Sequence, residues 1–210
     1  PNVQPLSVWN ARLLAIVTLD ADKTVSGESI EALGRLALGD LVARGESGHV
    51  LDLVEQFGTT PMGDKGFIVH FVRGLKSYDT AREAHRATGS NPEEPTTDSS
   101  VASDYRAAAR LLEAAIDQPD AAQFKADRAR AAVALGRARF FAGDMLDAAD
   151  AFREGFDLYG VQSAQGEEAL WLSIIALERA GKGTGAGAST SAGTDKSTLL
   201  RRDQTIALFL

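Results

Sequence analysis

Apolar residues recur every three or four positions along most of the chain, the spacing that places them on one face of an α-helix. Residues 50–57 and 145–159 show this pattern most clearly. Period-two alternation, which marks a half-buried β-strand, does not persist in any segment. The pattern therefore predicts an all-α fold. The predicted helices cover residues 5–19, 28–44, 48–57, 65–88, 102–117, 121–142, 145–159, 166–180 and 197–209.

Proline and glycine mark the ends of these predicted helices. Residues 6–60 and 120–210 contain no proline, a residue that breaks a helix in its interior. Gly143 and Gly160 each follow a periodic segment, where a left-handed C-terminal cap is common. Glycines at such positions predict short connections between antiparallel helices.

Two segments interrupt the helical pattern. Residues 88–103 contain two prolines, two glutamates and a Thr-Thr-Asp-Ser-Ser run, and residues 183–194 contain only Gly, Ala, Ser and Thr. Neither composition can bury an apolar core. We therefore predict flexible insertions at 88–103 and 183–196, within a single helical domain that spans residues 1–210.

Residues 129–160 carry an internal pattern of small and large positions. Small residues stand where two antiparallel helices would touch, large residues stand beside them, and glycine stands at the turn. In chain order the pattern comprises Leu135, Gly136, Ala138, Phe140, Gly143, Asp144, Ala148 and Phe152. It resembles the tetratricopeptide repeat, a pair of antiparallel helices. The chain departs from that family's usual aromatic, tyrosine and proline at Ala132, Arg139 and Gly160, respectively.

Weaker copies of the same pattern lie at residues 36–57, 65–119 and 169–209. The resemblance thus implies an α-solenoid of about four antiparallel helix pairs, two of which contain the inserted loops. Another helical-repeat fold or an irregular helical fold is the alternative.

Composition excludes several classes of function. The chain has 210 residues, no cysteine and a formal net charge of −7. Without cysteine there can be no disulfide, zinc–thiolate site, iron–sulfur cluster or cysteine nucleophile. The acidic balance argues against a general nucleic-acid binder, and no apolar run is long enough to span a membrane. Alanine occurs 35 times, 22 of them between residues 102 and 180, which favours closely packed helices.

A search for catalytic or metal-binding motifs identifies none. The three histidines, His49, His70 and His85, include no pair at the i, i+4 spacing of a helical metal site. The glycine-rich run at 181–187 follows a predicted helix rather than a strand, which argues against a phosphate-binding loop. We therefore predict no metal, no cofactor and no enzymatic activity.

The predicted helix 121–142 is unusually basic for an acidic chain. It contains five cations and one acidic residue, Asp127, and Arg130 and Arg137 lie seven positions apart, on one face. The resemblance implies that these two arginines, with Phe141 and Trp171, form part of a concave groove. A guanidinium pair beside aromatic rings suits an acidic peptide or a carboxylate terminus. The alternative is a solvated basic face that offsets neighbouring acidic helices.

These observations together predict a non-catalytic protein–protein interaction module that binds a peptide or protein segment. One alternative is self-association or domain spacing, for which the apolar run at 206–210 is the candidate contact. A helical enzyme or small-ligand-binding domain is another. Because the chain begins with Pro1 and ends on an apolar run, we expect it to be a piece of a longer protein, and no compartment is predicted.

Overall fold

The computed structural model describes Leu41, residues 65–182 and residues 196–208. These residues form six α-helices and one 3₁₀ turn, and no strand occurs among them. The elements are α4 (Phe67–Ala87), α5 (Ser99–Ile116), η2 (Ala121–Phe124), α6 (Lys125–Ala142), α7 (Met145–Tyr159), α8 (Ala164–Gly181) and α9 (Lys196–Ile206). The prediction of an all-helical chain is confirmed for this part.

Some predicted elements lie outside the described residues. They include the helices at 5–19, 28–44 and 48–57, apart from the buried, helical Leu41, and nearly all of the insertion at 183–196.

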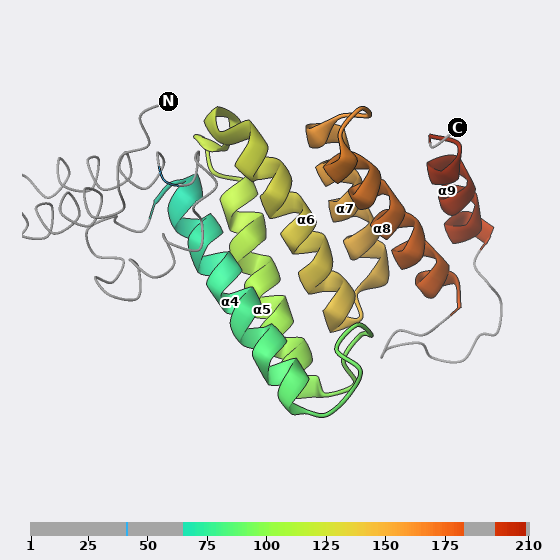
Figure 1. Cartoon of the computed structure of the whole chain (residues 1–210), viewed down its shortest axis with the longest axis horizontal. Coiled ribbons are helices and arrows are strands. Elements are labelled where there is room, and N and C mark those ends of the chain that lie inside the picture. The colour runs from blue at the N-terminus through green and yellow to red at the C-terminus, as the bar shows by residue number, and fades with distance from the viewer. Residues whose placement is uncertain (1–40, 42–64, 183–195, 209–210) are drawn as a thin grey trace, which may run out of the picture.

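Consecutive helices pack against one another from α4 through to α9 (Figure 1). Helix α4 also contacts α6, which follows it by two positions in the order of helices. This succession of helices forms a row, and the loop between α4 and α5 lies at the lower ends of these two helices and curves toward α6 (Figure 1).

Helix α5 begins at Ser99, which corrects the predicted boundary because residues 99–103 had been assigned to a flexible insertion. The side chain of Asp98 accepts hydrogen bonds from the backbone N–H groups of Ser100, at 2.8 Å, and Val101, at 3.1 Å. Such N-caps satisfy backbone donors that otherwise have no partner in the first turn. The polar run that resembled a loop is therefore partly the start of a helix.

Small residues set the spacing between the helices. A Cβ atom added at Gly136 of α6 would lie 2.5 Å from Cδ1 of Phe152 on α7. A Cβ atom at Gly74 of α4 would lie 2.7 Å from Cγ of Leu112 on α5. Ala138 and Ala148, two small positions of the sequence pattern, are fully buried. The helices approach closely because these positions carry almost no side chain.

Candidate functional site

Two adjoining hollows lie along helices α4, α6 and α8, and we call them together the α4–α6–α8 groove. The first has a volume of about 280 Å³, and its lining includes Phe71, Leu75, Arg130, Val133, Tyr159 and Gln165. The second has a volume of about 460 Å³, and its lining includes Arg82, Phe140, Phe141, Leu172, Ile175 and Arg179. Both are lined by Tyr78, Arg137 and Glu168, which makes the groove continuous.

The three helices that line the groove run in the same direction. The first hollow takes residues from the N-terminal and middle parts of α4, α6 and α8, with Tyr159 from α7. The second takes residues nearer the C-terminal ends of α4, α6 and α8, with Phe152 from α7. We therefore call them the N-terminal and C-terminal hollows. Helix α5 contributes no lining residue to either hollow, so the groove is formed mainly by alternate helices.

Two arginines predicted from the sequence, Arg130 and Arg137, both line the N-terminal hollow. Arg130 Nη1 lies 2.9 Å from Oδ1 of Asp127, a carboxylate that is only 6% exposed. Burial raises the pKa of Asp127, and the Arg130 guanidinium offsets part of that rise. Arg137 Nη2 lies 2.7 Å from Oε1 of Glu168 on α8. Each arginine thus already pairs with a carboxylate of the chain.

Tyr78 lies where the two hollows meet. Burial raises its pKa to about 12, although the nearby cations Arg82 and Arg137 act in the opposite direction. Its hydroxyl is therefore neutral at physiological pH and can donate a hydrogen bond to a bound group.

The C-terminal hollow contains two guanidinium groups that lie over phenylalanine rings. The guanidinium carbon of Arg82 lies 4.2 Å from the centroid of Phe141, and that of Arg179 lies 5.1 Å from the centroid of Phe140. The two rings contact each other edge to face, with centroids 5.5 Å apart. Stacking on an aromatic ring orients a guanidinium and still leaves its N–H groups available for a carboxylate.

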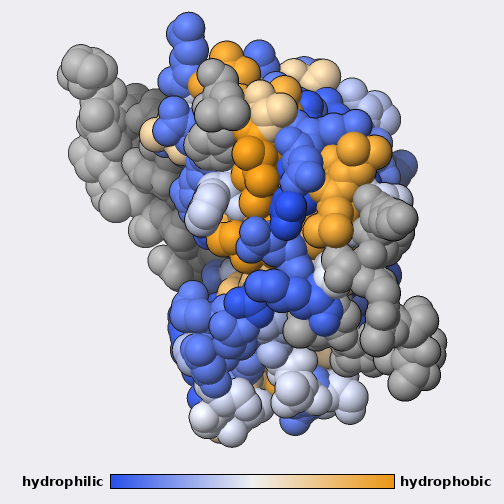
Figure 2. Space-filling model, turned by 90° about the vertical axis from the view of Figure 1, so that its right-hand side faces the viewer, coloured by the Kyte–Doolittle hydropathy of each residue, from blue (hydrophilic) through white to orange (hydrophobic). Residues whose placement is uncertain are grey.

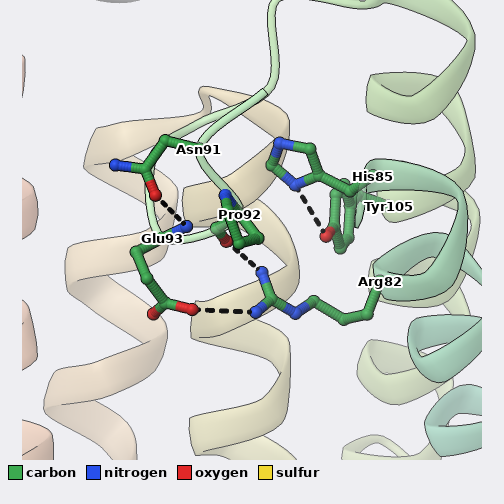
Figure 3. A network of polar contacts seen from close by, with 6 residues as sticks. All are labelled: Arg82, His85, Asn91, Pro92, Glu93 and Tyr105. Carbon is green, nitrogen blue, oxygen red and sulfur yellow. Dashed lines mark hydrogen bonds and ion pairs between the residues drawn. The ribbon is translucent and has the colours of Figure 1, made fainter. Parts of the chain in front are cut away.

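The α4–α5 loop, residues 88–98, meets these two arginines. Arg82 donates hydrogen bonds to the backbone oxygen of Pro92 and, over 3.2 Å, to Oε1 of Glu93 (Figure 3). Arg179 forms a two-point ion pair with Glu94, in which Nη2 lies 3.0 Å from Oε1. The hydrogen bond from Arg179 holds the pKa of Glu94 below the ordinary value. The loop is therefore joined to both α4 and α8.

Behind the groove, His85 and Tyr105 form a buried polar pair. The Nδ1 atom of His85 lies 3.1 Å from the Tyr105 hydroxyl oxygen (Figure 3), and both side chains are fully buried. The Nε2 atom of His85 has no hydrogen-bond partner among the described residues. Burial lowers the pKa of His85, and the neighbouring Arg82 cation lowers it further, while Glu93 acts in the opposite direction. His85 is therefore neutral at pH 7 in the folded state.

We expect acid to destabilise the fold through His85. In the unfolded chain this histidine protonates near pH 6.5, whereas in the folded chain it protonates only at lower pH. Falling pH therefore favours the unfolded state, by up to about 1.4 kcal/mol per pH unit, from about pH 6.5 down to the folded pKa. Urea denaturation between pH 8 and 5 measures this slope. His85→Asn should reduce it, and equal slopes for the two proteins would contradict the assignment.

Phe141 and Trp171, the other two residues predicted for the groove, differ in their positions. Phe141 is buried and lines the C-terminal hollow. Trp171 is 56% exposed and lines neither hollow. The residues of α8 that line the C-terminal hollow are Glu168, Leu172, Ile175 and Arg179, which recur at helical spacing along one face of the helix. Trp171 lies beside that face.

Tyr78, Arg82, Phe140 and Arg179 were missed by the sequence analysis. Tyr78 and Arg82 are four residues apart and so share a face of α4, the spacing that could have identified them. Arg179 gave no comparable signal, because its carboxylate partner lies 85 residues away in the sequence.

The C-terminal end of the helix row carries exposed apolar side chains. Figure 2 shows apolar patches among polar side chains at this end of the molecule. The exposed apolar residues of α9 and its last turn include Leu200, Ile206 and Leu208. The apolar run at 206–210 is the candidate self-association contact, and residues 209–210 lie outside the described part. Self-association remains an untested prediction.

None of the helices in the described ranges combines the length and apolar character needed to cross a membrane. The resemblance to the tetratricopeptide repeat rests on residue patterns of the sequence, chiefly that at 129–160. Comparisons of the chain with protein-family models, with curated proteins and with solved structures gave no match.

Proposed function

We propose that this chain is a tetratricopeptide-like interaction module that binds an acidic peptide or protein segment in the α4–α6–α8 groove. The observation that carries the proposal is the continuity of the two hollows along three helices that run in the same direction. Such a surface offers an elongated contact area with arginines and aromatic rings along its length. These are the residue types enriched where protein interfaces gain most of their binding energy.

The ion pairs already present in the groove are compatible with an acidic ligand. In the Arg137–Glu168 pair, the side chains are 45% and 56% exposed. Exposed pairs of this kind contribute at most about 1 kcal/mol to stability. An incoming carboxylate can therefore replace Glu168 at Arg137 with little loss. The partly buried Leu75, which lines the same hollow, can contact the ligand's aliphatic groups.

The proposal predicts that binding depends on the charge of Arg130 and Arg137. Because Arg130 pairs with the buried Asp127, reversal of its charge would risk unfolding, and the variant of choice is Arg130→Gln with Arg137→Glu. Acidic dodecapeptides selected from a random library on the unmodified chain serve as probes. We expect the variant to bind them at least about ten-fold more weakly by fluorescence anisotropy, a change of about 1.4 kcal/mol.

A matched control tests whether the effect comes from the groove or from net charge. Lys125→Gln with Arg110→Glu changes the net charge by the same amount at two exposed positions that line neither hollow. This control should bind the peptides within about two-fold of the unmodified chain. Equal losses in the two variants, or a library that yields no binding peptide, would overturn the proposal. Circular dichroism verifies that both variants are folded.

A further inference from the structure

The α4–α5 loop places two carboxylates against the two stacked arginines of the C-terminal hollow. Glu93 pairs with Arg82, and Glu94 pairs with Arg179. Arg82 lies on α4 and Arg179 on α8, so the loop bridges the two outer helices of the groove. The backbone N–H of Thr96 also donates to the backbone oxygen of Phe141, at 2.9 Å, which joins the loop to α6.

Local hydrogen bonds give the acidic part of the loop a defined conformation. The side-chain Oδ1 of Asn91 accepts from the backbone N–H of Glu93 at 3.1 Å (Figure 3), and the backbone oxygen of Asn91 accepts from Glu94 at 3.2 Å. Pro92 and Pro95 further restrict the backbone on either side. The turn therefore orients the two glutamate side chains toward different helices at little additional cost in entropy.

The C-terminal hollow has a larger excess of positive charge when the loop residues are left out. The hollow is lined by Arg82, Arg137 and Arg179, and its acidic lining residues are Glu93 and Glu168. Without the loop, three cations and a single carboxylate, Glu168, would remain among those lining residues. The two loop glutamates thus neutralise the part of the groove that is best suited to an acidic ligand.

We infer that the turn at residues 91–94 is an intramolecular competitor, and that Glu93 and Glu94 occupy the positions that two carboxylates of an acidic partner segment take at Arg82 and Arg179. The inference rests on the proposed function, and it adds the partner's chemistry and its regulation. A fitting partner carries neighbouring acidic side chains that reach both arginines. It must displace the loop, which lowers the affinity of the groove for weakly acidic segments.

The test measures how tightly hexaglutamate binds to the full chain when the loop carboxylates are neutralised. In Glu93→Gln with Glu94→Gln, the backbone oxygen of Pro92 can still accept from Arg82, so the loop keeps one of its contacts. We expect this double variant to bind hexaglutamate about ten-fold more tightly than the unmodified chain, because two ion pairs whose arginine side chains are largely buried no longer compete. Nuclear magnetic resonance titration measures the dissociation constants.

Two controls separate competition at the groove from a general charge effect. Asp104→Asn with Glu178→Gln removes the same charge at exposed positions that line neither hollow, and it should leave the affinity within about two-fold. Adding Arg179→Gln to the double loop variant should abolish the gain, whereas adding Arg110→Gln should preserve most of it.

The outcomes distinguish the inference from the proposed function. Equal affinity of the unmodified chain and the double loop variant for hexaglutamate overturns the loop inference. It leaves the proposed function standing if Arg130→Gln with Arg137→Glu still weakens binding of the selected peptides. A gain that matches the Asp104/Glu178 control, or that survives Arg179→Gln, also overturns the inference. Absence of binding by hexaglutamate and by every library peptide overturns both.

Discussion

Replacing Gly136 with alanine should lower the free energy of unfolding by about 2–3 kcal/mol, because the added methyl group overpacks the α6–α7 contact. An ideal Cβ atom there would lie 2.5, 2.7 and 2.8 Å from Cδ1, Cε1 and Cγ of Phe152. The Phe152 side chain is 1% exposed, and a shift of its ring away from the new methyl group would disturb its contacts in the buried cluster that includes Ala148 and Leu177. The intrinsic helix preference of alanine over glycine, about 1 kcal/mol, acts in the opposite direction and is smaller.

Urea denaturation followed by circular dichroism measures this loss, and a second substitution identifies its source. Phe152→Leu removes the ring that the new methyl group would strike. The double variant should therefore be less destabilised than the sum of the two single variants, by about 1 kcal/mol or more. Strict additivity would show that the loss at Gly136 does not arise from contact with Phe152.

The contact between Gly136 and Phe152 also shows what the sequence could predict about the fold. Helical periodicity and the order of small and large residues at 129–160 predicted two touching helices joined at Gly143, and the structure confirms that local arrangement. This information is local, because helix period, turn residues and neighbouring contacts all lie within about thirty residues. The position of α8 across the groove from α4 depends on contacts between distant segments, which periodicity does not contain.

In the candidate site, too, some features follow from local sequence patterns and others depend on packing between distant segments. The seven-residue spacing places Arg130 and Arg137 on one face of a helix, and both side chains line the N-terminal hollow. Trp171 was included on the expectation that a first helix would present it to the same surface, and the structure places it beside the lining face of α8. The direction in which a neighbouring helix faces is set by packing, which a single sequence does not reveal.

The loop at 88–98 illustrates a different difficulty. Its prolines and polar residues predicted a flexible segment, because such a composition buries little apolar surface. Its contacts in the structure are polar instead, and they depend on Arg82 and Arg179. Composition describes what a segment can bury, whereas hydrogen bonds to distant arginines depend on the tertiary fold.

Tyr105 should be the most sensitive position behind the groove. Its ring is fully buried and stacks on Phe141, with centroids 5.5 Å apart, and it contacts His85 edge to face at 5.8 Å. Tyr105→Ala removes these contacts and should lower the free energy of unfolding by about 4 kcal/mol. Tyr105→Phe retains the ring and removes only the hydroxyl, so it should cost about 1–2 kcal/mol.

The smaller of these two losses measures the polar contacts of the Tyr105 hydroxyl, with His85 and with Arg82, separately from the packing of the ring. With phenylalanine at position 105, Nδ1 of His85 loses the hydroxyl 3.1 Å away, and its Nε2 already lacks a partner among the described residues. A buried ring with neither nitrogen paired bears the desolvation cost of both. Tyr159→Phe is the control, because Tyr159 is only partly buried, and it should change stability by less than about 0.5 kcal/mol in the same urea titration. If Tyr105→Phe is as stable as the unmodified chain, the hydroxyl contributes nothing, and aromatic packing alone positions Phe141, and with it Arg82, at the groove.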